Sequence, residues 1–149
     1  MKMSMPISAL LHQRSPELWS ISPDATVFEA VKLMAEKNVG ALPVMSGQRL
    51  EGLFTERDYA RKVVLHGKSS KDTRVGEIVS SHVVTVTPDD TVEACMKLMT
   101  ENRVRHLPVL QNEQVVGIIS IGDVVNWTIS AQDATISQME QYITGSAAA

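Results

Sequence analysis

Residues 42–58 read LPVMSGQRLEGLFTERD, and residues 107–123 read LPVLQNEQVVGIISIGD. Each stretch has an apolar run, a short polar link, a second apolar run around a glycine, and a hydroxyl residue followed three positions later by aspartate. This pattern predicts two strands that are joined by a tight turn and followed by a helix. Because the pattern occurs twice in one chain, it indicates a duplicated fold.

The duplication extends well beyond these two stretches. A shift of 65 residues aligns residues 19–62 with residues 84–127 without a gap, and 14 of the 44 aligned positions are identical. A single unit of about 45–60 residues would have a marginal core, so we expect the two units to pack on each other. The chain of 149 residues is then one module with pseudo-two-fold symmetry.

Each unit is predicted to have the element order β-α-β-β-α, which makes the fold class α+β with two pseudo-symmetric units packed as one module. A short strand, around residues 20–21 or 84–86, leads into a Pro-Asp turn. Thr26 and Thr91 then suit the N-cap of a helix with one apolar face. Two strands follow in each unit, over residues 41–45 and 50–54, and over residues 106–110 and 115–119. The second helix is expected to begin after Thr55 or Ser120.

The predicted boundaries follow from this order and from the polar linker near residue 70. Short helices are expected before each unit, near residues 7–11 and 75–79, and a last helix near residues 136–142. The predicted segments are the first unit with its leading helix and linker (7–73), the second unit (74–130), a C-terminal helix (131–144) and a tail (145–149).

Composition excludes several classes of protein. The formal net charge of -3 argues against a nucleic-acid partner held by bulk attraction to phosphates. A single cysteine, Cys95, makes neither an internal disulfide nor a multi-cysteine metal site, and the four histidines lack ligand spacing, so no metal is expected. The chain has no apolar run of bilayer length and no signal peptide, so we expect no membrane and a cytoplasmic location.

The hydroxyl-x-x-aspartate motif at Thr55–Asp58 and Ser120–Asp123 has two interpretations. In the structural one, it is a capping box that closes the start of the second helix. In the functional one, a helix start at a strand end offers N–H groups to an anion, and the carboxylate accepts hydrogen bonds from both hydroxyls of a ribose. The second interpretation points to a nucleotide.

Basic residues are divided unequally between the two units. The second helix of the first unit has Arg57, Arg61 and Lys62, whereas Arg105 and His106 lead into the middle strand of the second unit. If the pseudo-two-fold axis brings these segments together, the five residues surround one cleft beside Asp58, and the cleft beside Asp123 is the poorer one for phosphate. The alternative is a solvated basic helix face with scattered charges at strand ends.

These paired motifs, together with Arg105-His106-Leu107-Pro108-Val109, resemble a pair of CBS domains, the Bateman module, over roughly residues 7–130. Residues 55–62 and 136–143 are more narrowly similar to small stand-alone bacterial CBS-pair proteins that bind AMP or NAD(H). The resemblance implies ribose and hydroxyl contacts from Asp58, Asp123, Thr55 and Ser120, phosphate contacts from Arg105 and His106, and adenine contacts from Ile21, Ser22, Pro23, Val86, Thr87 and Pro88. Phosphate contacts from Arg57, Arg61 and Lys62 rest on charge placement and the narrower similarity. A homodimer shaped as a flat disc is also implied.

The sequence therefore predicts a non-catalytic regulatory module that senses cellular energy or redox state. AMP is the expected ligand, with NAD(H) or ATP/ADP as further candidates, and the regulated protein is unknown. One alternative is a nucleotide-processing enzyme that uses the same cleft, although no paired base and nucleophile is evident. A second alternative is a purely structural dimerisation module.

Overall fold

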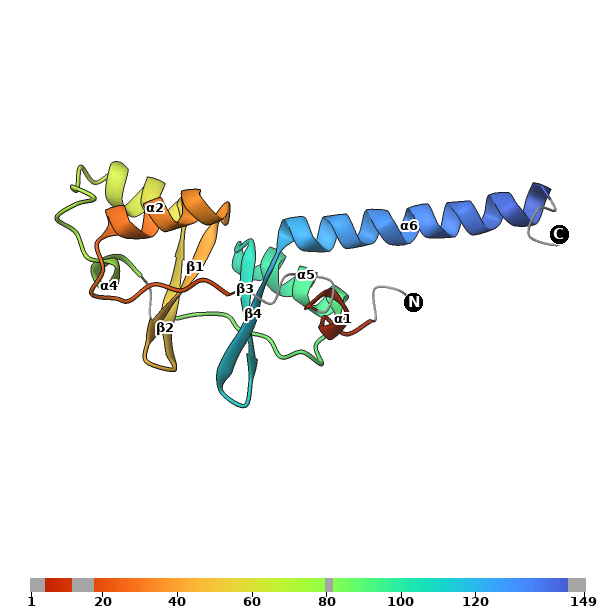
Figure 1. Cartoon of the computed structure of the whole chain (residues 1–149), viewed down its shortest axis with the longest axis horizontal. Coiled ribbons are helices and arrows are strands. Elements are labelled where there is room, and N and C mark those ends of the chain that lie inside the picture. Colours follow the sequence, from red (N-terminus) through yellow and green to blue (C-terminus); the bar gives the residue numbers. More distant parts are fainter. Residues whose placement is uncertain (1–4, 12–17, 80–81, 145–149) are drawn as a thin grey trace.

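The computed structural model describes residues 5–11, 18–79 and 82–144, with side chains up to residue 130 and at residues 139 and 140. Two similar units lie side by side, and a long final helix leads away from them (Figure 1). The elements in chain order are α1 (Ser8–Leu11), α2 (Val27–Lys37), β1 (Ala41–Ser46), β2 (Arg49–Thr55), α3 (Glu56–Asp58), the π-helical turn η2 (Tyr59–Val64), α4 (Val75–Ile78), α5 (Val92–Asn102), β3 (His106–Gln111), β4 (Gln114–Ser120) and α6 (Ile121–Thr144).

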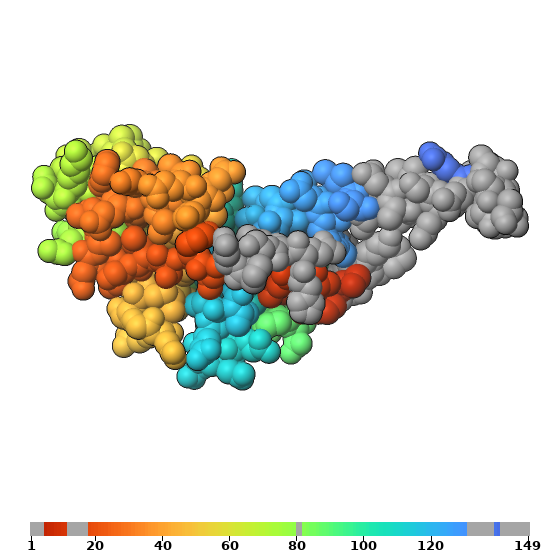
Figure 2. Space-filling view, in the orientation of Figure 1, coloured from red at the N-terminus to blue at the C-terminus, as the bar shows by residue number. Residues whose placement is uncertain are grey.

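The two hairpins show the duplication most directly. Strand β1 pairs with β2, and β3 with β4, both antiparallel and with the same irregularity after Val44 and after Val109. The hairpin tips protrude as two neighbouring lobes (Figure 2), and Gln114 Nε2 donates to Gln48 Oε1 between them at 3.3 Å. The α+β class and the predicted hairpins are therefore confirmed.

The predicted first strand of each unit is reduced to a single bridging residue. Ile21 bridges to Val44 and Val86 bridges to Val109, both in parallel. The Ile21 N–H donates to Pro43 O at 3.0 Å, and Ile21 O accepts from Met45 N at 2.9 Å. Proline follows two residues later and lacks an N–H, so the ladder ends there and the prediction of a strand was too long.

The first helix of each unit begins at the predicted threonine. Thr26 Oγ1 accepts from Glu29 N at 3.1 Å, and the Glu29 carboxylate accepts from Thr26 N at 3.2 Å. Thr91 Oγ1 likewise accepts from Ala94 N at 3.0 Å. Both helices end at a residue in the left-handed conformation, at Asn38 and Arg103, each with φ of 54°.

Each of the two short leading helices packs into the core of the unit that it does not lead, which the sequence did not predict. Ile7 and Leu10 of α1 are buried in the core of the second unit, whereas Val75 and Ile78 of α4 are buried in the core of the first. The second core also holds Cys95, and burial raises the pKa of its thiol to about 11. Because each leading helix completes the core of the other unit, the two units fold as one module.

The last helix differs most from its prediction. Helix α6 runs for 24 residues without interruption, so the second helix of unit two and the predicted C-terminal helix are one element. Residues 124–144 contain no glycine or proline that would end a helix. Despite its length, neither α6 nor any other described helix is apolar enough to span a bilayer. The predicted tail, 145–149, lies outside the described residues.

Candidate functional site at the junction of the two units

A cavity among the described residues lies where the start of α3 in the first unit faces the start of β3 in the second. It has a volume of about 850 Å³ and is called the Asp58 cleft here. The first unit contributes residues 55–58, 61 and 62, and the second contributes residues 102–106, while residues 82–84 close a further side. Both units must therefore be in place for this cleft to exist.

Asp58 uses one carboxylate oxygen to cap its helix and directs the other toward a cation. Its Oδ2 accepts from Thr55 N at 3.0 Å and from Thr55 Oγ1 at 3.1 Å, and Thr55 Oγ1 accepts from Asp58 N at 3.1 Å. Its Oδ1 lies 3.4 Å from Lys62 Nζ. The capping box is thus real, and it fixes a half-buried carboxylate at the wall of the cleft.

Cations outnumber carboxylates in the lining of the Asp58 cleft. Five arginine or lysine side chains line it against two carboxylates, those of Glu56 and Asp58. Arg57 Nη1 donates to the Arg103 carbonyl oxygen at 2.6 Å and so joins the two units. The guanidinium groups of Arg61 and Arg105 make no hydrogen bond or ion pair with any described residue. Such a cleft favours a small anion.

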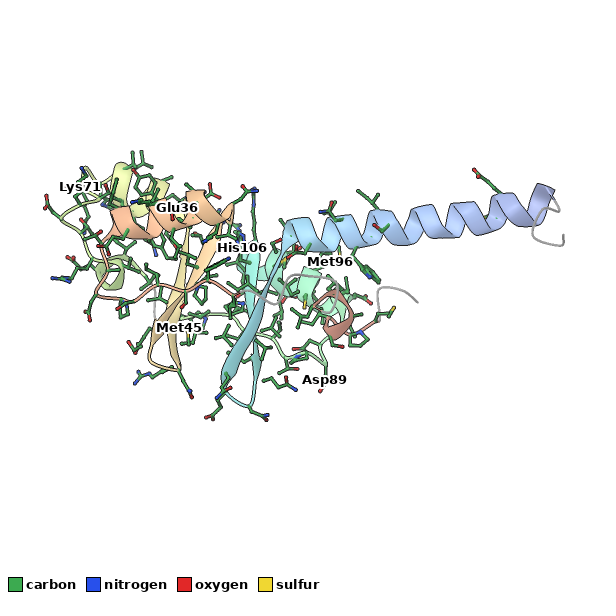
Figure 3. All side chains as sticks on the ribbon, in the orientation of Figure 1. Glu36, Met45, Lys71, Asp89, Met96 and His106 are labelled. Atoms are coloured by element: carbon green, nitrogen blue, oxygen red, sulfur yellow. The ribbon has the colours of Figure 1, made fainter. Side chains whose placement is uncertain are left out.

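His106 lies at the junction of the two units, at the start of β3 (Figure 3). Its side chain lines both the Asp58 cleft and a second cavity beside Asp123. Burial lowers the pKa of His106, and the charge of Arg105 lowers it further, whereas Asp123 and Glu56 act in the opposite direction. His106 is therefore neutral near pH 7 when the cleft holds no ligand.

Gly40 gives Glu56 and His106 the room that they occupy. A Cβ at position 40 would lie 2.8 Å from Glu56 Oε1 and 3.4 Å from His106 Nε2. The equivalent position in the second unit is Arg105. The two copies thus differ here, with a small residue in the first unit and a cationic residue in the second. This difference concentrates positive charge in the Asp58 cleft.

The cavity beside Asp123, called the Asp123 cleft, is smaller and has no arginine or lysine in its lining. Its volume is about 270 Å³, and it is lined by Leu11, Leu18, Trp19, residues 38–41, His106, residues 116–118, Ser120 and Asp123. Asp123 Oδ2 accepts from Ser120 N at 2.9 Å, as in the first unit. The side chain of Leu11 approaches closely, since a Cβ at Gly117 would lie 2.7 Å from Leu11 Cδ2.

The structure brings together most of the residues that the sequence singled out. The lining of the Asp58 cleft contains Thr55, Arg57, Asp58, Arg61, Lys62, Arg105 and His106, and the lining of the Asp123 cleft contains Ser120, Asp123 and His106. Their roles as ribose and phosphate contacts stay predictions. The cleft also contains Glu56 and Arg103, which were not predicted as site residues, although Arg103 belongs to the same basic run as Arg105 in the sequence.

The residues expected to contact adenine lie outside both cavity linings. These are Ile21, Ser22, Pro23, Val86, Thr87 and Pro88. The segments that do reach the linings are slightly upstream, at residues 82–84 for the Asp58 cleft and residues 18–19 for the Asp123 cleft. Residue 84 belongs to the predicted strand at 84–86, but no motif in the sequence marks residues 18–19 or 82–83 as part of a site.

Comparison with known proteins explains this geometry. A model of the CBS domain matches residues 13–65 and, a second time, residues 75–130. The chain belongs to the CBS-domain family. Its two hydroxyl-x-x-aspartate motifs and its junction clefts are thus equivalent features of the two CBS domains.

Relatives of this CBS pair include both short and longer proteins. The mitochondrial CBS domain-containing protein CBSX3 of Arabidopsis thaliana is 44% identical over 133 residues, which cover 86% of this chain and 64% of the plant protein. The CBS domain-containing protein YhcV of Bacillus subtilis is 31% identical and matched over 91% of its length. A structure of a signal-transduction protein with CBS domains from Burkholderia ambifaria superposes with a TM-score of 0.83 at 45% identity, covering 86% of this chain and 96% of that one.

Proteins that consist of a CBS pair are generally regulatory, nucleotide-sensing modules without catalytic activity, and CBS domains typically bind adenosine ligands. Within the described residues, no three histidine, cysteine, aspartate or glutamate side chains are grouped as metal ligands. A hexameric CBS-CP12 protein from cyanobacteria superposes with a TM-score of 0.73 at 33% identity, over 81% of this chain and 69% of that one. CBS pairs of this kind therefore also occur within larger assemblies.

Proposed function

We propose that this CBS pair is a non-catalytic sensor that binds one adenine nucleotide, AMP in the first place, in the Asp58 cleft. The observation that carries the proposal is the lining of this cleft. The carboxylate of Asp58, which caps the start of α3, lies there with the unpaired side chains of Arg61 from the first unit and Arg105 from the second. The carboxylate suits a ribose, and the arginines suit a phosphate. No other described cavity combines the two features.

The proposed binding mode follows from the positions of these groups. The ribose hydroxyls donate to Asp58, whose carboxylate Thr55 already orients. The phosphate lies among Arg61, Lys62 and Arg105, and Arg57 exchanges its bond to the Arg103 carbonyl for the ligand. The base then rests on the apolar side chains of residues 83–84, or on the predicted segment at residues 86–88. NAD(H), ATP and ADP present the same ribose and additional phosphates to the same groups.

The regulatory effect arises from linkage. A ligand that contacts both units binds the arrangement seen here more tightly than one in which the cleft is open, so it shifts the equilibrium between them. A protein that recognises the closed arrangement would then respond to the nucleotide level. The flat-disc homodimer implied by the CBS resemblance is part of this proposal, since ligand and assembly would be coupled.

Calorimetric titration of AMP into the Asp58→Ala variant tests the proposal. We expect at least a tenfold weaker affinity than in the unsubstituted chain, because a charged hydrogen bond of about 1.5–3 kcal/mol is lost. The matched control is Asp123→Ala, which breaks the equivalent capping box in the other unit. That variant should bind AMP almost as tightly as the unsubstituted chain.

Two outcomes would overturn the assignment. Unchanged AMP affinity in Asp58→Ala would remove Asp58 from the site, and equal losses in both variants would show that capping, rather than ribose contact, matters. Chromatography of AMP, ATP and NADH after incubation with the chain tests the enzyme alternative. Release of a product at a rate proportional to protein concentration would show that the chain is an enzyme and would overturn the proposal of a non-catalytic sensor.

A further inference from the structure

The two clefts share a part of their walls, and the imidazole of His106 lies in that part (Figure 3). Among the described residues, Gly40 and His106 line both clefts. The two are in contact, since a Cβ at position 40 would lie 3.4 Å from His106 Nε2 and 3.5 Å from His106 Cε1. The ring is half-buried. Of these two residues, only His106 can change its charge, and it does so at a place that faces both clefts.

Charged groups of both signs act on His106, and they come from different elements. Glu56 of α3 and Asp123 of α6 favour its protonated form, whereas burial and the charge of Arg105 favour the neutral form and together lower its pKa. The lining of the Asp58 cleft holds further charged or titratable side chains, those of Arg57, Asp58, Arg61, Lys62, His82 and Arg103. The protonation of His106 therefore depends on the balance of charge in the Asp58 cleft.

A phosphate group in the Asp58 cleft would change this balance. His106 directly follows Arg105, and both line the cleft, so an anion held by Arg105 lies close to the ring. A phosphate monoester carries close to two negative charges at pH 7, and a nearby anion favours the charged form of histidine. Because the ring is half-buried, water and salt screen this attraction less than at an exposed site. Phosphate binding should therefore raise the pKa of His106.

We propose that His106 takes up a proton when a nucleotide binds in the Asp58 cleft, and that this proton makes the cleft select a phosphorylated ligand over the free nucleoside. The inference rests on the proposed function, because it concerns the phosphate end of the same ligand. The unprotonated ring nitrogen accepts a proton from the buffer, and the imidazolium then donates a charge-assisted hydrogen bond to the phosphate. Adenosine brings no anion, so it binds while the ring stays neutral.

Linkage fixes the direction of the resulting pH dependence. Binding that takes up a proton becomes tighter as the pH falls, and the slope of log Kd against pH equals the number of protons taken up. The effect ends below the pKa of His106 in the free chain, where the ring is already protonated, and above its pKa in the complex, where the ring stays neutral. Arg61 and Arg105 keep their charge throughout, so their contribution to phosphate binding does not vary with pH.

Calorimetric titration of AMP into the full chain, in buffers that differ in ionisation enthalpy, counts the protons taken up. At neutral pH we expect a fraction of a proton per AMP for the unsubstituted chain and none for adenosine. His106→Gln should lose most of this uptake. The matched control is His82→Gln, because His82 is an exposed histidine in the lining of the same cleft. That variant should keep the uptake of the unsubstituted chain.

The pH dependence of affinity provides a second measurement. Between about pH 8 and 6.5, the AMP affinity of the unsubstituted chain and of His82→Gln should increase about threefold more than that of His106→Gln. The phosphate of AMP itself titrates in this range, but it does so equally for all three chains and cancels in the comparison. Adenosine affinity should stay within about twofold over the same range.

NMR of the unsubstituted chain with labelled histidine measures the pKa of His106 directly and requires no variant to fold normally. We expect this pKa to be higher with saturating AMP than without ligand. The inference is overturned if AMP binds without proton uptake, if His82→Gln abolishes the uptake, or if the pKa of His106 is the same in both states. Each of these results leaves AMP binding, and hence the proposed function, intact. Absence of AMP binding in every buffer would overturn both proposals.

Discussion

Asp58 and Asp123 stand at equivalent positions of the duplication, and both cap a helix through the same hydrogen bonds. The residues around them differ, because Arg105 lines only the Asp58 cleft, whereas its equivalent in the first unit, Gly40, lines both clefts and has no charge. Together with Arg57, Arg61, Lys62 and Arg103, whose equivalents in the other copy are uncharged, this difference makes two similar clefts unequal in charge. The unequal charge, more than the aspartates themselves, decides which cleft suits a phosphate.

His106 predicts a pH dependence of stability in the ligand-free chain. Burial lowers its pKa from the ordinary value of 6.5 in the folded state, so the unfolded state binds more protons as the pH falls through 6.5. The free energy of unfolding should therefore decrease on acidification and level off below the folded pKa. We expect the melting temperature to fall as the pH is lowered through 6.5, and His106→Gln to reduce this fall.

The control for His106 is His66→Gln, since His66 is exposed and outside both clefts. Its removal should leave the pH profile of the melting temperature unchanged. Identical profiles for the two variants would show that the buried imidazole is not the group responsible. Glu56, Asp123 and Arg105 face His106 in both the unsubstituted chain and the control, so their own effects cancel in this comparison.

At the scale of elements, the capping box at the start of α2 is separable from the proposed site. Thr26→Ala removes the hydroxyl that accepts from Glu29 N, which should cost about 1 kcal/mol of unfolding free energy. Urea denaturation measures this loss. AMP affinity should stay within twofold, because Thr26 lines neither cleft. The control Ser20→Ala changes an exposed hydroxyl before the turn and should leave stability unchanged.

Local signals account for the elements that the sequence predicted well. The hairpins and the helices after Thr26 and Thr91 have both periodicity and a start signal, and each begins within a residue of its predicted position. The exchange of α1 and α4 between the units has no local signal, because four-residue apolar helices look alike whichever core they complete. The continuity of α6 was not predicted, because the aligned repeat ends at Trp127 and the second unit was predicted to end at residue 130, before a separate C-terminal helix.

The cleft itself could be predicted because both the basic residues and the internal repeat are visible in the sequence. Arg57, Arg61 and Lys62 belong to one copy, and Arg105 to the other, so only the pseudo-two-fold relation was needed to bring them together. That residues 82–84 line the cleft could not be predicted, since this depends on how the connecting chain crosses between the units. Residues 82–84 belong to the site because of where the folded chain places them, and not because their residue types indicate a binding role.

At the scale of the whole molecule, a ligand in the Asp58 cleft should stabilise both units together. Arg57 already joins them through the Arg103 carbonyl, and each leading helix completes the core of the other unit. At a free AMP concentration about 100 times Kd, the stabilisation is roughly 2.7 kcal/mol. For a chain of this size, that corresponds to a rise in melting temperature of about 5–11 °C in a single cooperative transition.

Comparison of AMP with adenosine resolves the part of this effect that comes from the phosphate. Arg105→Ala should lower the AMP-induced rise in melting temperature but leave the smaller rise with adenosine unchanged, because adenosine has no anion for the guanidinium to meet. Arg49→Ala, at a hairpin tip where Arg49 pairs with Glu51 at 3.5 Å, serves as the control for loss of a positive charge. Equal reductions for both ligands would place Arg105 away from the phosphate. If neither ligand changes the melting temperature, the cleft does not bind an adenine nucleotide. That result would favour the alternative of a purely structural dimerisation module.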